Sequence, residues 1–257
     1  MPPAVEKVLV RLVLIILLIG FILLLGFGYW FLNTKVFKPQ VSPTPLPIPS
    51  PTMTPEQTTA PSPTPETIIP KALIPMAKTK VMEVAPEAKL KDLLAENLKA
   101  LDGETKNGEF VQIVFKKENG FYNARDFFNG LGLTIPAAII DGLNQTPDDF
   151  TLFVYRQTAG WRLGFLVKTK ENLGQEFLDW EKEMERVWSD FFGLMGKTKP
   201  ALAKVFRDAQ YLEEPFRFQT FNLNDLGICY AFFNDKLVFT SSAESLKKVF
   251  DLLKANP

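Results

Sequence analysis

Residues 150–168 read FTLFVYRQTAGWRLGFLVK, and this stretch carries the strongest structural signal in the 257-residue chain. Two runs rich in β-branched and aromatic residues stand on either side of the short segment TAG, a pattern typical of a β-hairpin. In the second run, apolar residues alternate with Arg162, Gly164 and Lys168. We therefore expect an antiparallel hairpin with one buried face and one face turned to solvent.

A long amphipathic helix is predicted directly after this hairpin, over residues 171–195, because apolar side chains recur there at helical spacing. The end of the chain has a similar plan, with strands expected around 228–241 and a helix over 243–254. At a shift of 73 residues, TKENLGQEF at 169–177 overlays SAESLKKVF at 242–250. Two interpretations stay open: an internal duplication of a hairpin-plus-helix unit, or coincidence, since capped helices after strands are common.

Further elements complete an α+β prediction, a mostly antiparallel sheet covered by amphipathic helices. The expected strands and helices follow from period-2 and helical apolar spacing, bounded by Gly and Pro signals. They comprise helices at 86–103, 124–131, 136–143 and 199–209, and strands at 109–117 and 216–223.

The N-terminal third has a different character. Residues 12–32 are 21 residues without a charge, long enough at about 1.5 Å per residue to cross a bilayer core of about 30 Å. No small-residue cleavage signal follows, so a retained transmembrane helix is predicted after a short cytoplasmic tail at 1–11. Residues 33–85 are rich in Pro, Thr and Ser and predict an extended linker. One domain is expected over 86–257.

This arrangement predicts a single-pass protein of the cell membrane, with its C-terminal domain extracytoplasmic. The lysines and arginine that flank the apolar segment balance on its two sides, so the orientation depends on interpreting the linker as an extracytoplasmic stalk. The expected partners are the lipid bilayer, contacted by the N-terminal helix, and a cell-wall or surface protein or glycan.

The amino-acid composition excludes several classes of partner, catalytic site and metal site. The chain has 29 basic residues, 29 acidic residues, no histidine and one cysteine. The balanced charge argues against a nucleic-acid partner. The missing histidine excludes Ser-His-Asp catalysis and His-ligated metals, and one cysteine forms no internal disulfide. Cys229 lies in the apolar run GICYAFF and is interpreted as a buried thiol. No metal site and no cofactor are predicted.

The stretch TSSAESLKKVF, residues 240–250, contains two competing motifs. Ser245 and Lys248 have the spacing of the nucleophile and base in penicillin-binding enzymes, but no S-x-N or K-T-G element follows. Ser241 and Glu244 have the spacing of a helix capping box. The helix cap is the preferred interpretation, so no catalytic residue is predicted.

Other polar and aromatic groups give weaker signals. Three carboxylate pairs are considered for a glycosidase site, which needs two carboxylates that face one cleft; they are Asp148 with Asp149, Glu181 with Glu185, and Glu213 with Glu214. Glu181 and Glu185 are interpreted as part of a solvated helix face, and Asp148 with Asp149 as a loop before a strand. Three aromatic residues, Trp161, Tyr122 and Tyr155, are candidate ligand contacts, with burial in the core as the alternative.

Two segments follow the predicted anchor and stalk: FLVKTKENLGQEFLDWEKEM at 165–184 and AFFNDKLVFTSSAESLKKVFDLL at 231–253. With this layout the chain resembles uncharacterised single-pass surface proteins of bacteria with small genomes, which carry a domain of unknown function. We expect a binding or envelope-assembly domain without catalytic activity. The alternatives are an envelope hydrolase that uses carboxylates or a Ser-Lys pair, and a self-associating structural subunit.

Overall fold

The computed structural model describes residues 68–101, 103–221 and 224–255. The predicted cytoplasmic tail, the transmembrane helix at 12–32 and most of the predicted linker lie outside these residues. Within the described part of the chain, no helix is long and apolar enough to cross a membrane.

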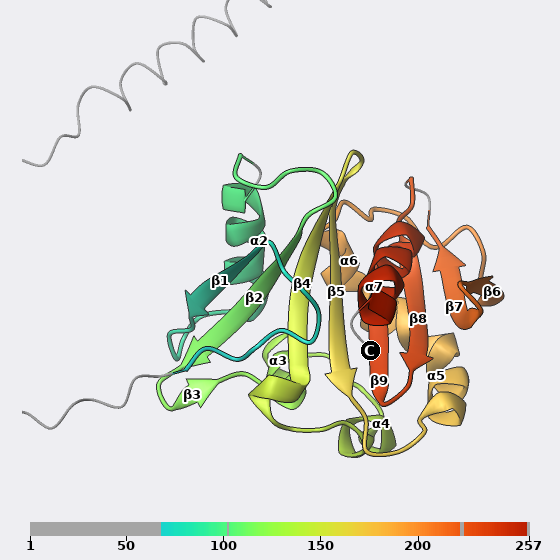
Figure 1. The fold of residues 1–257 in the computed structure, drawn as a ribbon, viewed down its shortest axis with the longest axis horizontal. Helices are drawn as coiled ribbons and strands as arrows, with labels where there is room; N and C mark the ends of the chain where they lie inside the picture. Colours follow the sequence, from blue (N-terminus) through green and yellow to red (C-terminus); the bar gives the residue numbers. More distant parts are fainter. Residues whose placement is uncertain (1–67, 102, 222–223, 256–257) are drawn as a thin grey trace, which may run out of the picture. The chain divides into compact units, whose positions relative to one another are not determined.

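One nine-stranded sheet organises the described residues (Figure 1). The strand order is β1-β2-β4-β5-β9-β8-β7-β6, with the short β3 paired to β2. Every pairing is antiparallel except that of β1 with β2. The predicted α+β class with a mostly antiparallel sheet is therefore confirmed. The strands are β1 Lys78–Glu83, β2 Phe110–Lys117, β3 Gly120–Phe121, β4 Phe150–Gln157, β5 Gly160–Lys168, β6 Arg207–Tyr211, β7 Glu214–Thr220, β8 Gly227–Phe233 and β9 Lys236–Thr240.

Helices cover the two faces of the sheet unequally. The first face is packed by α2 Leu90–Leu101, α3 Ala124–Gly130, α4 Ala137–Gly142, α5 Gly174–Val187 and α6 Ser189–Gly193. The second face is packed by α7 Ala243–Ala255, which lies in front of β8 and β9 in Figure 1. A short 3-10 turn at Pro147–Asp149 leads into β4.

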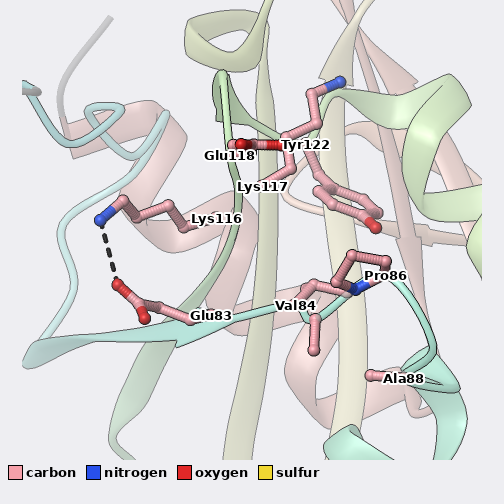
Figure 2. Close-up of a pocket in the computed structure, with 9 residues that line it drawn as sticks. Glu83, Val84, Pro86, Ala88, Lys116, Lys117, Glu118 and Tyr122 are labelled. Atoms are coloured by element: carbon pink, nitrogen blue, oxygen red, sulfur yellow. Dashed lines mark hydrogen bonds and ion pairs between the residues drawn. The ribbon is translucent and has the colours of Figure 1, made fainter.

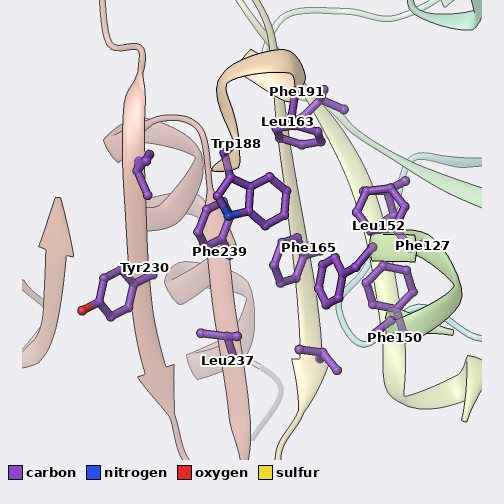
Figure 3. Packing of buried hydrophobic residues seen from close by; sticks show 14 of the residues in the cluster. Phe127, Phe150, Leu152, Leu163, Phe165, Trp188, Phe191, Tyr230, Leu237 and Phe239 are labelled. Carbon is purple, nitrogen blue, oxygen red and sulfur yellow. The ribbon is translucent and has the colours of Figure 1, made fainter. Parts of the chain in front are cut away.

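Aromatic rings fill the core of the first face (Figure 3). Phe165 of β5 and Phe239 of β9 stack with ring centres 5.0 Å apart, and Trp188 lies over both at 5.8 and 4.7 Å. Phe127 and Phe128 of α3 pack against Phe165 from the other side. Stacked and edge-to-face rings of this kind stabilise a core beyond their buried area.

The hairpin at 150–168 forms as predicted, but both of its faces are buried. Arg162, expected to face solvent, is only 3% exposed, and Leu166 is fully buried on the second face. Gly164 lies directly under the Phe153 ring, where a Cβ would come within 2.4 Å of a ring carbon. The prediction of a solvated face is therefore wrong, because α7 and its neighbouring loop cover that side.

The duplicated hairpin-plus-helix unit is not present as a structural repeat. Both hairpins lie side by side in the sheet, with β5 next to β9. However, α5 packs on the first face and α7 on the second. A rotation that superposes the hairpins therefore leaves the helices on opposite sides. The helix starts also disagree, because α7 begins at Ala243 and α5 at Gly174, a shift of 69 rather than 73 residues.

Residues 199–209 do not form the predicted helix. Pro200 lacks an N–H, and the next two backbone N–H groups are taken by other elements. Ala201 donates to the Glu185 carboxylate at 2.6 Å, and Leu202 donates to the Thr220 carbonyl at 3.2 Å. Phe206 is drawn into the core, and strand β6 follows from Arg207. Tertiary contacts thus outweigh the local helical pattern.

The fold begins earlier than the predicted boundary at residue 86. Strand β1 falls inside the predicted linker, yet it pairs with β2 over six residues. The segment 70–76 also crosses the second face of the sheet. Leu73 donates to Thr151 Oγ1 at 2.9 Å, Gln112 donates to the Pro70 carbonyl at 3.1 Å, and Ile74 is 4% exposed. We call residues 70–76 the N-terminal strap.

Because the strap buries its Ile74 side chain against the second face of the sheet, Ile74→Ala is expected to lower the free energy of unfolding by about 2–5 kcal/mol. Ile68→Ala is the matched control, since Ile68 is 87% exposed and should tolerate the change. Urea unfolding of the full chain, followed by tryptophan fluorescence, measures both. Equal stabilities for the two variants would mean that the strap behaves as a loose linker.

Candidate binding site

A surface groove of about 700 Å³ lies between the β1–α2 connection and the β2–β3 hairpin (Figure 2). One wall comes from the residues that follow β1, and the other from the end of β2 and from Tyr122. Because β1 and β2 are parallel, both strands deliver their C-terminal ends to this edge. The lining residues are Glu83, Val84, Ala85, Pro86, Ala88, Lys116, Lys117, Glu118 and Tyr122.

The β2–β3 hairpin positions Tyr122. Gly120 adopts a φ of 126°, a conformation that favours glycine, and this turns the chain back along β2. The Tyr122 backbone N–H then donates to the Phe115 carbonyl at 2.9 Å. Its ring packs against the Phe115 ring at 5.8 Å between centres and lies across from Pro86 in Figure 2. The ring is thus fixed on one side and half-buried.

Charged side chains form the rim of the groove. Lys116 pairs with Glu83 at 3.0 Å, and Lys117 pairs with Asp126 at 2.7 Å. The Lys117 ammonium also lies 5.6 Å from the centre of the Tyr122 ring, within the range of a cation–π contact. Among the described residues, Glu118 has no ion-pair partner. The groove therefore combines an aromatic and proline wall with hydrogen-bonding groups at its mouth.

The other two candidate aromatics lie elsewhere. Tyr155 is 1% exposed, so the prediction that it contacts a ligand is wrong. Trp161 is half-buried at the β4–β5 turn, where the Arg156 guanidinium lies 5.0 Å from its ring centre. The strand register places this turn beside Phe110, at the opposite end of β2 from Tyr122. The three residues do not form one surface.

Tyr155 belongs to a polar cluster at the start of α7 that sequence reasoning missed. Its hydroxyl donates to Glu244 at 2.8 Å, and Gln157 Nε2 donates to both Glu244 and Asp225 at 2.7 Å. The buried Arg162 guanidinium donates to the carbonyls of Asp225 and Asn224 at 2.8 and 2.6 Å. These contacts join β4, β5 and the loop before β8 to the helix.

A serine caps the helix, but the predicted Ser241–Glu244 capping box is wrong. Ser242, rather than Ser241, caps α7 by accepting the Ser245 N–H at 3.0 Å. Ser241 accepts the Leu163 N–H at 2.8 Å, and Glu244 turns to the polar cluster. Ser245 is fully buried with its hydroxyl 2.7 Å from that of Ser242, while Lys248 pairs with Asp251. The Ser-Lys spacing therefore brings no nucleophile and base together.

Each of the three carboxylate pairs has at least one member in an ion pair, and Glu181 with Glu185 is not the solvated pair that the sequence predicted. Glu181 accepts two hydrogen bonds from Arg217 and one from Tyr230, all at 2.7 Å. Glu185 pairs with Lys197 at 3.1 Å. The other ion pairs from these groups are Asp149 with Lys168 at 2.6 Å and Glu214 with Lys254 at 3.0 Å.

Burial raises the pKa of several groups outside the groove. Burial, then the neighbouring Glu244 carboxylate, raises the pKa of Tyr155. Burial, then Glu181, does the same for Tyr230. Burial also raises the pKa of the Cys229 thiol, and the predicted buried cysteine is confirmed. These shifts follow from burial in the sheet and from structural hydrogen bonds.

No protein-family model, curated protein or solved structure matches the chain. The resemblance to single-pass bacterial surface proteins therefore stays a prediction, and the candidate site depends on its own geometry.

The two buried tyrosines predict a loss of stability at high pH. The unfolded chain ionises its tyrosines near their ordinary pKa of 10.0, whereas folded Tyr155 and Tyr230 keep their protons. Above about pH 10 the free energy of unfolding should therefore fall by about 1.4 kcal/mol per pH unit for each tyrosine, in addition to the fall that the buried Cys229 thiol, whose ordinary pKa is 9.0, begins about one pH unit lower. Urea unfolding across this range measures the slope.

Tyr230→Phe removes one of the two groups and should make that fall less steep. An unchanged slope in this variant would contradict the assignment of the proton to Tyr230.

Proposed function

We propose that the chain is a membrane-anchored, extracytoplasmic binding protein that captures a cell-surface carbohydrate in the Tyr122 groove without catalysing a reaction. The uncharged segment at 12–32 and the proline-rich residues after it support the anchor and the stalk. The folded domain supplies the binding surface.

One observation carries the carbohydrate assignment: Tyr122 presents its ring inside an open groove, with hydrogen-bonding groups at the rim. A sugar ring has apolar C–H faces that pack on an aromatic ring, and hydroxyls that need polar partners. Pro86 extends the apolar wall, while Glu118 and Lys116 offer an acceptor and a donor. The dimensions of the groove suit a few sugar units rather than a buried small molecule.

The engaged polar groups favour binding over hydrolysis. A glycosidase needs two carboxyl groups that face one cleft. The groove has Glu83 and Glu118 on its rim, and Glu83 is held by Lys116. Ser245, the candidate nucleophile, lies on the buried face of α7 and is not open to a substrate.

Tyr122→Ala is expected to weaken binding about tenfold or more, because buried interface tyrosines commonly contribute over 1 kcal/mol. The full chain in detergent, mixed with insoluble envelope polysaccharide, measures the bound fraction by sedimentation. Tyr122→Phe separates the ring from the hydroxyl. Tyr211→Ala, at the opposite edge of the sheet, controls for loss of any tyrosine. Equal binding by Tyr122→Ala and the unchanged chain would refute the site.

The orientation has its own test. A protease added to intact cells should cleave within the proline-rich residues 39–67 and release the C-terminal domain. Its folded core should resist, because proteases cut exposed segments first. A domain that stays intact and cell-associated, while a surface marker is digested, would place it on the cytoplasmic side.

A further inference from the structure

A second surface, unrelated to the Tyr122 groove, lies at the other end of the strand order. Residues 197–207 read KTKPALAKVFR and link α6 to β6 with four basic residues and no acidic one. Against α5 they form a groove of about 470 Å³, lined by Lys182, Glu185, Arg186, Ser189, Lys197, Thr198, Lys199 and Pro200. We call residues 197–207 and the facing basic side chains of α5 the basic apolar surface.

Its apolar part consists of two outward side chains. Leu202 is 72% exposed and Val205 is 66% exposed, more than any other large apolar residue between 70 and 255 that the structure describes. Phe206 follows directly and is only 8% exposed, so the chain turns inward after Val205. Leu202 and Val205 are three residues apart, and both lie in the basic segment.

The backbone beneath these side chains is held in place. The Ala201 N–H donates to Glu185 Oε1 at 2.6 Å, and the Leu202 N–H donates to the Thr220 carbonyl at 3.2 Å. The Ala203 carbonyl accepts Gln219 Nε2 at 3.0 Å. Three hydrogen bonds to α5 and β7 therefore fix the segment, so Leu202 is presented outward by a supported backbone.

The side chains around Leu202 carry an excess of positive charge. The charge of Lys197 is already paired, because its ammonium forms an ion pair with Glu185 and lies 4.7 Å from the centre of the Phe221 ring. Four further basic side chains have no ion-pair partner among the described residues; they are Lys182, Lys199, Lys204 and Arg207. This excess stands out in a domain whose residues 86–257 have 22 basic and 25 acidic side chains.

We propose that the basic apolar surface docks the domain on an anionic membrane surface. Leu202 and Val205 would enter the boundary between headgroups and acyl chains, while the lysines contact headgroup phosphates. Charge alone would fit any polyanion. The fixed, outward apolar pair favours a bilayer, since a soluble polyanion would leave it in water.

The length of chain before the domain permits this docking. Residues 33–67 separate the predicted anchor from the described part of the chain. A proline-rich segment of this length, at about 3.1 Å per residue, would reach at most on the order of 100 Å, so its length permits contact between the domain and the bilayer. Docking on the membrane would then alternate with extension from it.

A fluorescent label at residue 202 tests the proposal in the full chain. Cys229 is 3% exposed, so Leu202→Cys supplies the reactive thiol for an environment-sensitive nitrobenzoxadiazole probe. The chain is reconstituted in vesicles of phosphatidylglycerol and phosphatidylcholine, or of phosphatidylcholine alone. Docking predicts a blue-shifted emission and quenching by nitroxide lipids in the anionic vesicles only, both weakened by added salt.

Charge variants make the test specific. Lys199→Glu with Lys204→Glu should lower the docked-to-undocked ratio at least about fivefold per lysine. Lys89→Glu with Lys106→Glu, an equal charge change at two exposed lysines elsewhere, should leave it near that of the unchanged chain. A probe at Glu87→Cys, beside the Tyr122 groove, should show no lipid quenching.

Two results would overturn the proposal. The first is equal quenching in anionic and zwitterionic vesicles. The second is a probe response to soluble polyphosphate with none to anionic vesicles, which would identify the ligand as a soluble phosphate polymer. Tyr122→Ala should leave docking unchanged, so failure of the carbohydrate site and failure of membrane docking are separable.

Discussion

The rest of the structure depends on the junction between the two halves of the sheet, where Phe165 stacks on Phe239 with ring centres 5.0 Å apart. These rings lie on β5 and β9, the two central strands, which join the β1-β2-β4-β5 half of the sheet to the β9-β8-β7-β6 half. Trp188 covers both rings at the point where α5 ends and α6 begins. Trp188 is thus the residue between the two helices as well as the ring that covers the junction. The chain beyond α6 then returns along the outside of β7 as the basic apolar surface.

Local patterns in the sequence were sufficient for the elements whose signals are local. The β4–β5 hairpin depends on residues within a few positions of one another, and so does the cap of α7, which the sequence placed one residue too early, at Ser241 instead of Ser242. The burial of Arg162 depends on carbonyls about sixty residues away, so strand alternation placed it in solvent. The same limit explains the duplicated unit: the pattern of hairpin and helix was visible, but the face of the sheet that each helix covers was not.

The candidate surfaces show a similar division. Tyr122 was a candidate ligand contact only because it is aromatic, and whether it binds a ligand stays a prediction. Its partner wall, Glu83 to Ala88, follows a strand that the sequence assigned to the linker. The parallel pairing of β1 with β2 needs a crossover through α2, and no short-range pattern specifies such a pairing. Residues 199–209 have apolar spacing suited to a helix, yet Glu185 and Thr220 capture their backbone groups.

The strand order separates the two proposed surfaces. The Tyr122 groove lies at the β1–β2 side, and the basic apolar surface lies beside β7, near the other end of the same sheet. A ligand of a few sugar units in the groove would therefore not cover Leu202 or Lys199. The N-terminal strap crosses the second face and is bonded to β2 and β4, whereas β5, β9 and β8 lie between these strands and β7. The strap is thus bonded to the half of the sheet that holds the Tyr122 groove, and residues 201–203 are bonded to β7 in the other half.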